Sequence, residues 1–329
     1  MEKIFWNDRE QRLRAFWRML IQGELSLLLM LCFGIVLSVV LLLGNFLSAG
    51  IPDLSDLESQ MMLSPASLLI SGVGGFLALL LSTFVAGRFL DRRSFADFGF
   101  RFSRGWWLDF GFGLVLGALL MAGIFGVEYA LGWVTVKATF ATSLQNWPFP
   151  VALLIYGLLF LCVGIYEELW FRGYQLRNLA EGLNLSFLGS KNALLSAWLL
   201  SSLAFGVAHL GNPGATLFSA FNIALAGIFL GFGYVLTGEL ALPIGLHIAW
   251  NFFQGNVFGF PVSGTLSTTS FLVIEQGGPV LWTGGVFGPE GGILGIVAMV
   301  VGSLLTLLWV RYRHGDVKLH TRLSTYAVR

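Results

Sequence analysis

Three short motifs with polar side chains stand within long apolar stretches of this sequence. The motifs are EELWFR, FGVAH and HIAWN, and their candidate residues are Glu167, Glu168, Arg172, Phe205, His209, His247 and Asn251. A glutamate and a histidine can take a proton from an attacking water, while histidine and asparagine can donate hydrogen bonds to an oxyanion. The same glutamate and histidines could instead form a metal site with an open position. The set therefore favours chemistry on an activated water, with or without a metal ion.

The spacing within EELWFR separates the two carboxylates. On a helix, Glu168 and Arg172 are four residues apart, so they share a face and can form an ion pair. The side chain of Glu167 projects about 100° away from that of Glu168 and is left without this partner. Glu167 is therefore the better candidate for a general base. An ion pair that ends a membrane span at the interface would give the same spacing, and this alternative stays open.

The two histidine motifs have both a functional and a structural interpretation. Phe205 and His209 share a helix face, and so do His247 and Asn251. A single histidine near the end of a span is often structural, and polar side chains also join helices by hydrogen bonds across a bundle. Charged groups within the bilayer are costly, however, at about 2.5–3.5 kcal/mol for a charge at its centre. Three such clusters in one chain therefore indicate a functional site.

The composition indicates a membrane protein. Of the 329 residues, 56% are hydrophobic and 11% are charged, and the mean hydropathy is +0.79. A soluble domain has about 25% charged residues, and a membrane-spanning helix needs roughly 20 apolar ones. Eight segments approach this length, namely 25–46, 67–87, 107–131, 149–171, 194–210, 216–236, 241–258 and 291–310. The sequence thus predicts an all-α, polytopic fold with about eight transmembrane helices.

The distribution of basic residues predicts the orientation. With eight spans and the N-terminus inside, 18 of the 19 Lys and Arg residues fall on the inner side, Lys137 being the exception. The positive-inside rule then places both termini in the cytoplasm. The net charge of +1 gives no electrostatic reason to expect nucleic acid as a partner. Cys32 and Cys162 lie in apolar runs, so neither a disulfide framework nor a thiolate metal site is predicted.

The order and spacing of the motifs resemble those of the type II CAAX prenyl protease group, also called the CAAX-protease and bacteriocin-processing family. The family patterns are EExxxR, FxxxH and HxxxN, and all three occur here in that order within about residues 149–258. The resemblance implies an eight-helix membrane fold with a catalytic cavity between spans 4, 5 and 7, open to the cytosol. It also implies an endopeptidase that acts on a membrane-associated protein or peptide, in CAAX-type or bacteriocin-related processing.

Carried over by motif, the resemblance also implies roles for single residues. Glu167 would activate the water, His209 would help to hold it, and His247 with Asn251 would form the oxyanion hole. The supporting residues would be Glu168, Arg172 and Phe205. A Zn²⁺ enzyme with Glu167, His209 and His247 as metal ligands and an enzyme without a metal both remain open. Because no HExxH pair places two zinc ligands on one helical turn, we favour the second slightly.

These inferences divide the chain into five parts. They are a cytoplasmic N-terminal segment (1–24), the first three spans (25–148), a catalytic core (149–258), a Gly-rich outer loop (259–290), and the last span with a basic cytoplasmic tail (291–329). We expect the chain in the plasma membrane of a bacterium, with the lipid bilayer and a membrane-associated substrate as partners. A non-proteolytic scaffold or a transporter with the same polar cluster is the alternative. A transporter predicts two related halves with interrupted helices, a symmetry that we do not find in the sequence.

Overall fold

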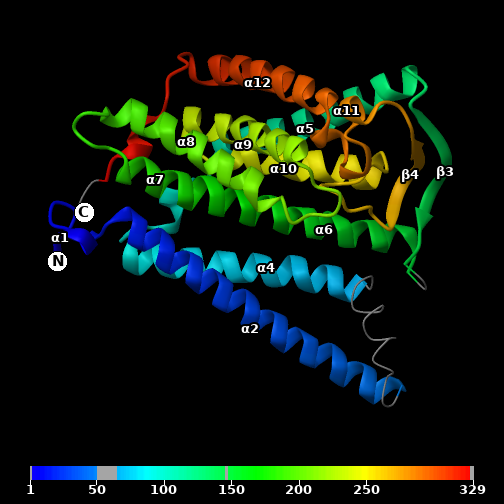
Figure 1. Cartoon of the computed structure of the whole chain (residues 1–329), viewed down its shortest axis with the longest axis horizontal. Helices are drawn as coiled ribbons and strands as arrows, with labels where there is room; N and C mark the ends of the chain where they lie inside the picture. The colour runs from blue at the N-terminus through cyan, green and yellow to red at the C-terminus, as the bar shows by residue number, and fades with distance from the viewer. Residues whose placement is uncertain (1, 50–64, 145–146, 327–329) are drawn as a thin grey trace.

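The computed structural model describes residues 2–49, 65–144 and 147–326, and within these ranges the chain is mostly helical (Figure 1). The long helices are α2 (Ala15–Ala49), α4 (Pro65–Val85), α5 (Arg104–Ala130), α6 (Phe149–Glu168), α8 (Gly189–Ala208), α9 (Leu217–Thr237), α10 (Ala241–Phe252) and α12 (Ile293–His314). The short helices are α1 (Glu2–Phe5), η1 (Ala86–Leu90), η2 (Phe95–Phe98), η3 (Leu169–Leu176), α7 (Arg177–Gly182), η4 (Phe253–Val257), α11 (Val280–Thr283), η5 (Gly285–Phe287), η6 (Pro289–Gly291) and η7 (Thr321–Ser324). Seven helices of the described ranges are long and apolar enough to cross a membrane. The prediction of a polytopic helical protein is confirmed.

The seventh predicted segment, 241–258, forms a short central helix. α10 has 12 residues and continues into η4, a π-helical segment of 5 residues. At about 1.5 Å per residue the two cover about 25 Å, less than the roughly 30 Å of a hydrocarbon core. α10 packs against α5, α6 and α9, and most of its residues are buried. Because protein rather than lipid covers α10, it does not need the length of a lipid-exposed span.

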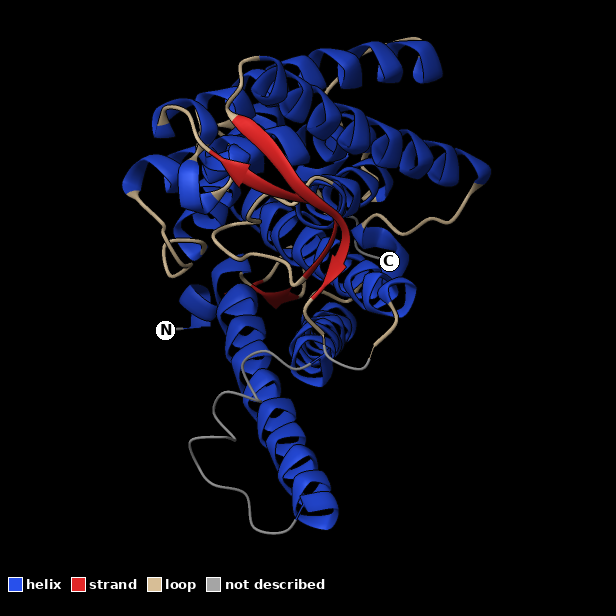
Figure 2. Ribbon diagram, turned by 90° about the vertical axis from the view of Figure 1, so that its right-hand side faces the viewer, coloured by secondary structure: helices blue, strands red, loops and turns tan. Residues whose placement is uncertain are grey.

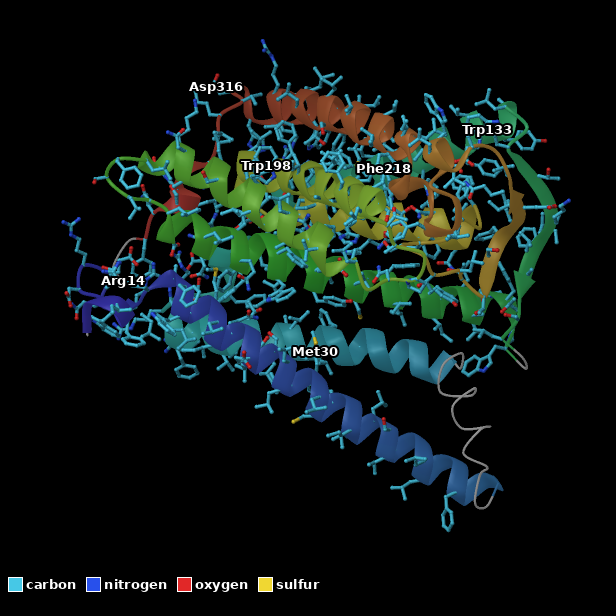
Figure 3. The ribbon with its side chains drawn as sticks, in the orientation of Figure 1. Arg14, Met30, Trp133, Trp198, Phe218 and Asp316 are labelled. Atoms are coloured by element: carbon cyan, nitrogen blue, oxygen red, sulfur yellow. The ribbon has the colours of Figure 1, made fainter. Side chains whose placement is uncertain are left out.

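Both ends of the chain lie at one end of the bundle, which we call the terminal end (Figure 1). There the guanidinium carbon of Arg12 lies 3.4 Å from the centre of the Tyr326 ring. Figure 3 shows Arg14 and Asp316 at this end and Trp133 at the opposite end. A chain that starts and finishes at one end must traverse the bundle an even number of times. In the described residues, α10 together with the seven helices that are long enough to cross a membrane supplies eight traverses.

Two strands cover the opposite end of the bundle, which we call the sheet end. β3 (Val134–Thr142) pairs antiparallel with β4 (Thr269–Gln276), with a bulge between Val136 and Ala138 (Figure 2). A second, very short pair, β1 (Trp6–Asn7) and β2 (Arg12–Leu13), lies near the N-terminus. Residues 259–290 were expected to form an outer loop, and neither β3 nor β4 was predicted. The alternating β-branched residues of VTVKATF could have indicated β3.

Close packing of α5 on α10 fixes the position of the third motif. Gly113 and Gly117, four residues apart on α5, face α10, and Gly245 of α10 faces α5. A Cβ atom at Gly117 would lie 2.6 Å from the Leu246 carbonyl oxygen, and one at Gly245 would clash with the Phe110 carbonyl oxygen. The two backbones are therefore in contact, as at the small-residue interfaces of other membrane helices. This contact fixes the position of His247 along the long axis of the bundle.

Candidate active site

The helix that carries the two glutamates is longer than the sequence indicated. α6 continues through η3 and α7, so that one apolar helix runs from Phe149 to Gly182. Glu167 and Glu168 lie near the middle of this helix, inside the bundle. The Glu168 side chain is fully buried and pairs with Arg172, whose Nη1 lies 2.8 Å from Glu168 Oε1. Arg172 Nη2 also donates to the Gly227 carbonyl of α9, 3.1 Å away.

His247 connects this ion pair with Glu167. Its Nδ1 lies 2.8 Å from Glu168 Oε1, and because a carboxylate oxygen accepts, Nδ1 carries the proton. The other ring nitrogen, Nε2, then faces Glu167 and lies 3.8 Å from its Oε2. That Oε2 atom is buried and has no hydrogen-bond partner in the described structure. Glu168 therefore orients the ring, while Glu167 keeps a free oxygen beside it.

His209 is oriented by the backbone. It is the C-cap residue of α8, and its Nδ1 lies 2.8 Å from the Phe205 carbonyl oxygen. Since a carbonyl oxygen only accepts, Nδ1 is the donor, and in the neutral ring Nε2 keeps its lone pair. The Phe205 ring lies 4.6 Å from the His209 ring and 4.4 Å from the Arg172 guanidinium carbon. Phe205 thus packs between the imidazole and the buried ion pair.

One cavity of about 390 Å³ brings the candidate residues together. Glu167, Phe205, His209, His247 and Asn251 all line it, while Glu168 and Arg172 lie behind its wall. Its other walls are mostly apolar and aromatic, contributed by Tyr156, Leu159, Phe160, Val163, Ile223, Phe229, Leu230 and Trp250 among others. The family resemblance implied a cavity between spans 4, 5 and 7, and residues of these three spans line this one.

Part of the outer loop forms a further wall of the cavity. Residues 262, 263 and 265–268 line it from the sheet end. The Tyr156 hydroxyl of α6 lies 2.9 Å from the Thr268 hydroxyl and accepts a hydrogen bond from the Thr268 amide at 3.0 Å. The segment is thereby attached to the same helix that carries Glu167. The cavity lies between the motif residues and the sheet end, away from the chain termini.

The metal-ligand set suggested by the sequence is not assembled. Among the described residues, no three His, Cys, Asp or Glu side chains are grouped closely enough to hold a metal ion. Glu167, His209 and His247 share the cavity, but they do not form such a group. The donor set in this arrangement does not fit a three-ligand zinc site, so we derive no chemical step through a metal.

Glu290 is a cavity residue that sequence reasoning missed. Its Oε1 accepts from the Ser263 amide at 2.6 Å, and its Oε2 accepts from the Gln254 side chain, three residues after Asn251. Burial raises the pKa of Glu290 to about 7, although the bonds from Ser263 and Gln254 oppose this shift. The carboxylate thus joins the loop wall to η4, the segment that continues α10. The signal in the sequence was a single acid in GPEGG, directly before an apolar run.

Glu290→Gln is expected to reduce the pH dependence of stability. Because the folded pKa is raised from 4.5 to about 7, the stabilising contribution is complete below pH 4.5 and is lost as the pH rises through about 7. The shift corresponds to roughly 3 kcal/mol. Thermal unfolding in detergent should show that wild type loses more stability than Glu290→Gln between these two pH values. Parallel profiles of the two proteins would show that Glu290 does not titrate in this range.

The comparison with protein families gives one match. Residues 148–253 match the family described as Type II CAAX prenyl endopeptidase Rce1-like. The matched region contains all three motifs, from Glu167 to Asn251, and confirms the resemblance seen in them. The comparisons with curated proteins and with solved structures found no match.

Proposed function

We propose, on the premise of this family match, that the chain is an intramembrane endopeptidase that hydrolyses a peptide bond by a glutamate-activated water. At the level of the family, the match supports CAAX-type endoproteolysis by an integral membrane protein. One observation supports the finer proposal most. Glu167, His209, His247 and Asn251 come from three different helices, yet they line a single cavity.

In this mechanism Glu167 acts as the general base. Its free Oε2 takes a proton from water, and the oxygen of that water attacks the carbonyl carbon of the scissile bond. The unprotonated Nε2 of His209 accepts the second hydrogen of the water and so fixes its position. When the C–N bond breaks, Glu167 returns its proton to the leaving nitrogen. A positioned general base of this kind contributes about 10²–10⁴-fold to the rate.

The oxyanion would be bound by His247 and Asn251. They are four residues apart on α10 and both line the cavity, so their side chains can donate to one oxygen. For Nε2 of His247 to donate, the ring must carry both protons, and the Glu168 carboxylate is then its counter-ion. Arg172 holds Glu168 in place, and the pair is therefore a positioning element.

The cavity walls and the distribution of basic residues support proposals for the substrate and for the location of the protein. We propose a membrane-associated protein or peptide as substrate, because the cavity lies within the bundle and its walls are largely apolar. The positive-inside distribution supports cytoplasmic termini in a plasma membrane, as in a bacterial chain.

A zinc-assisted variant of the reaction predicts that chelators inhibit cleavage and that Zn²⁺ restores it. The metal-free reaction predicts that neither chelators nor added Zn²⁺ changes the cleavage rate.

The function is tested by mapping peptide termini in membrane proteomes. Cells that carry wild type should contain termini that are missing in cells with Glu167→Ala at equal expression. Such termini would identify both the substrate and the cleaved bond. Identical maps under growth, stress and competition conditions would contradict proteolysis. A flux of solute in proteoliposomes, or unchanged partner binding and function by Glu167→Gln, would then support the transporter or the scaffold.

A further inference from the structure

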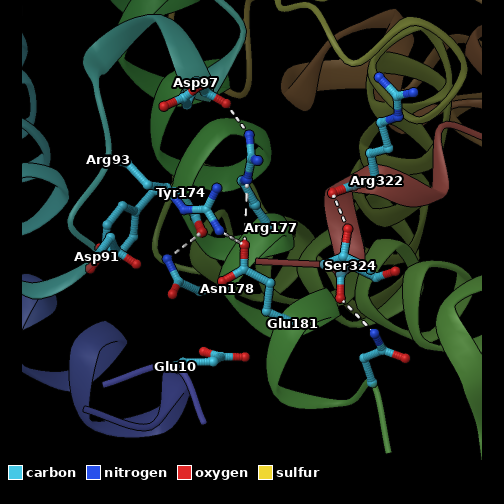
Figure 4. A network of polar contacts seen from close by, with 12 residues as sticks. Glu10, Asp91, Arg93, Asp97, Tyr174, Arg177, Asn178, Glu181, Arg322 and Ser324 are labelled. Carbon is cyan, nitrogen blue, oxygen red and sulfur yellow. Dashed lines mark hydrogen bonds and ion pairs between the residues drawn. The ribbon is translucent and has the colours of Figure 1, made fainter. Parts of the chain in front are cut away.

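A network of buried ion pairs occupies the terminal end, remote from the catalytic cavity (Figure 4). Its centre is Glu181 at the end of α7, whose side chain is 2% exposed. Arg12 Nη2 lies 2.7 Å and Arg18 Nη2 lies 3.4 Å from Glu181 Oε2, and Arg93 pairs with the other oxygen. Asp91 adds a second carboxylate, 2.6 Å from Arg18 Nη1. Arginines outnumber the carboxylates in this network.

A separate cavity of about 530 Å³ lies beside the network, and we call it the arginine cavity. The charged and titratable residues that line it are Arg92, Arg93, Asp97, Arg101, Arg177, His320, Arg322 and Tyr326. Asp97 is the one acidic residue among its described lining residues. Glu181 and Glu239 balance some of this charge from outside the cavity, through contacts with Arg93 and Arg101. The cavity therefore presents an excess of positive charge.

The pKa of His320 is affected by the positive charges around the arginine cavity. Its pKa is lowered, first by burial and then by the charges of Arg101, Arg322 and Arg177. The three arginines act in the same direction as burial, since nearby cations disfavour a further positive charge. A bound anion would relieve this repulsion.

The position of the cavity favours a lipid as the source of that anion. Its walls come from the segments that follow α4 and α9, from α7, and from the tail after α12, which are all at the terminal ends of spans. A neighbouring cavity of about 520 Å³ shares Arg92 and Arg93, and its other lining residues are Phe84, Gly87, Arg88, Ser94, Phe95 and Phe98. The three phenylalanines form its apolar part. Basic residues at the interface beside an apolar groove match the two parts of a phospholipid.

We propose that the arginine cavity binds the phosphate of an anionic phospholipid, with an acyl chain of that lipid along the neighbouring apolar cavity. Arg92 and Arg322 are both exposed at the cavity, and both can contact a phosphate by two hydrogen bonds. The central ion pairs around Glu181 remain intact when this lipid binds. The site is independent of the proposed peptidase cavity.

The test is native mass spectrometry of the purified full chain with phosphatidylglycerol or phosphatidylcholine. Wild type should retain phosphatidylglycerol preferentially. The double variant Arg92→Gln/Arg322→Gln should bind it about 25-fold more weakly, since each basic residue contributes about fivefold. Arg311→Gln, which removes an exposed arginine outside the cavity, should bind as wild type does, and thermal unfolding should confirm that all variants are folded.

Two results would overturn the proposal. One is equal retention of phosphatidylglycerol by the double variant and by Arg311→Gln, which would mean that the cavity is not the site. The other is complete displacement of the lipid by inorganic phosphate at millimolar concentration, which would identify a free anion as the ligand. Restored binding in Arg92→Lys/Arg322→Lys would support a charge-based site.

Discussion

Glu167→Gln is expected to lower kcat for peptide cleavage by about 10²–10⁴-fold, with little change in KM. The amide cannot take the proton from water, but it has nearly the shape of the carboxylate. Because Glu167 Oε2 has no hydrogen-bond partner in the described structure, the substitution breaks no hydrogen bond at that atom. The measurement is cleavage of the identified substrate by purified protein in liposomes.

Glu24→Gln provides the matched control for this experiment. Glu24 is a carboxylate on α2, exposed and outside the cavity that Glu167 lines. Its replacement should leave the cleavage rate as in wild type, and both variants should unfold at the wild-type temperature. A Glu167→Gln protein with full activity would refute glutamate-activated water, whatever the behaviour of the control.

Glu168→Leu is expected to reduce both stability and activity. It leaves the buried Arg172 without its carboxylate, and removing one partner of a buried ion pair costs about 3–5 kcal/mol. It also removes the acceptor for His247 Nδ1, so the ring loses the contact that orients it. The unfolding temperature and the cleavage rate should therefore both be lower than in wild type.

The double variant Glu168→Leu/Arg172→Leu separates these two effects. With both charges removed, an apolar pair fills the site, and much of the lost stability should return. Activity should stay low, because His247 still lacks its acceptor. Recovery of both properties would show that Glu168 acts only through the fold and not through the orientation of His247.

Sequence reasoning predicted the parts of the site that depend on helical spacing. The pairing of Glu168 with Arg172 follows from four-residue periodicity, and the structure contains it. The contact between Glu168 and His247 joins residues 79 positions apart and depends on how α6 packs against α10. No local pattern encodes that packing. The catalytic roles of these residues stay predictions.

The parts that sequence reasoning did not predict lie in connecting segments. β3 and β4 pair across a long stretch of chain, and Glu290 acquires its position only through this folded loop. α10 is short because its neighbours bury it, which a count of apolar residues cannot show. A cavity open to the cytosol also stays a prediction, since its loop wall lies at the end opposite the termini.

The strand pair at the sheet end has a consequence for how the newly made protein matures. Thr142 and Thr269, which pair across it, are 127 residues apart, and α6, α8, α9 and α10 lie between them. At roughly 5–20 residues per second, a ribosome needs about 6–25 s to make the partner of β3. All the motif residues are synthesised during this interval, before β4 and the loop wall that directly precedes it. The cavity is therefore completed late, after the motif residues have been made. Until then the nascent chain has a site without its loop wall.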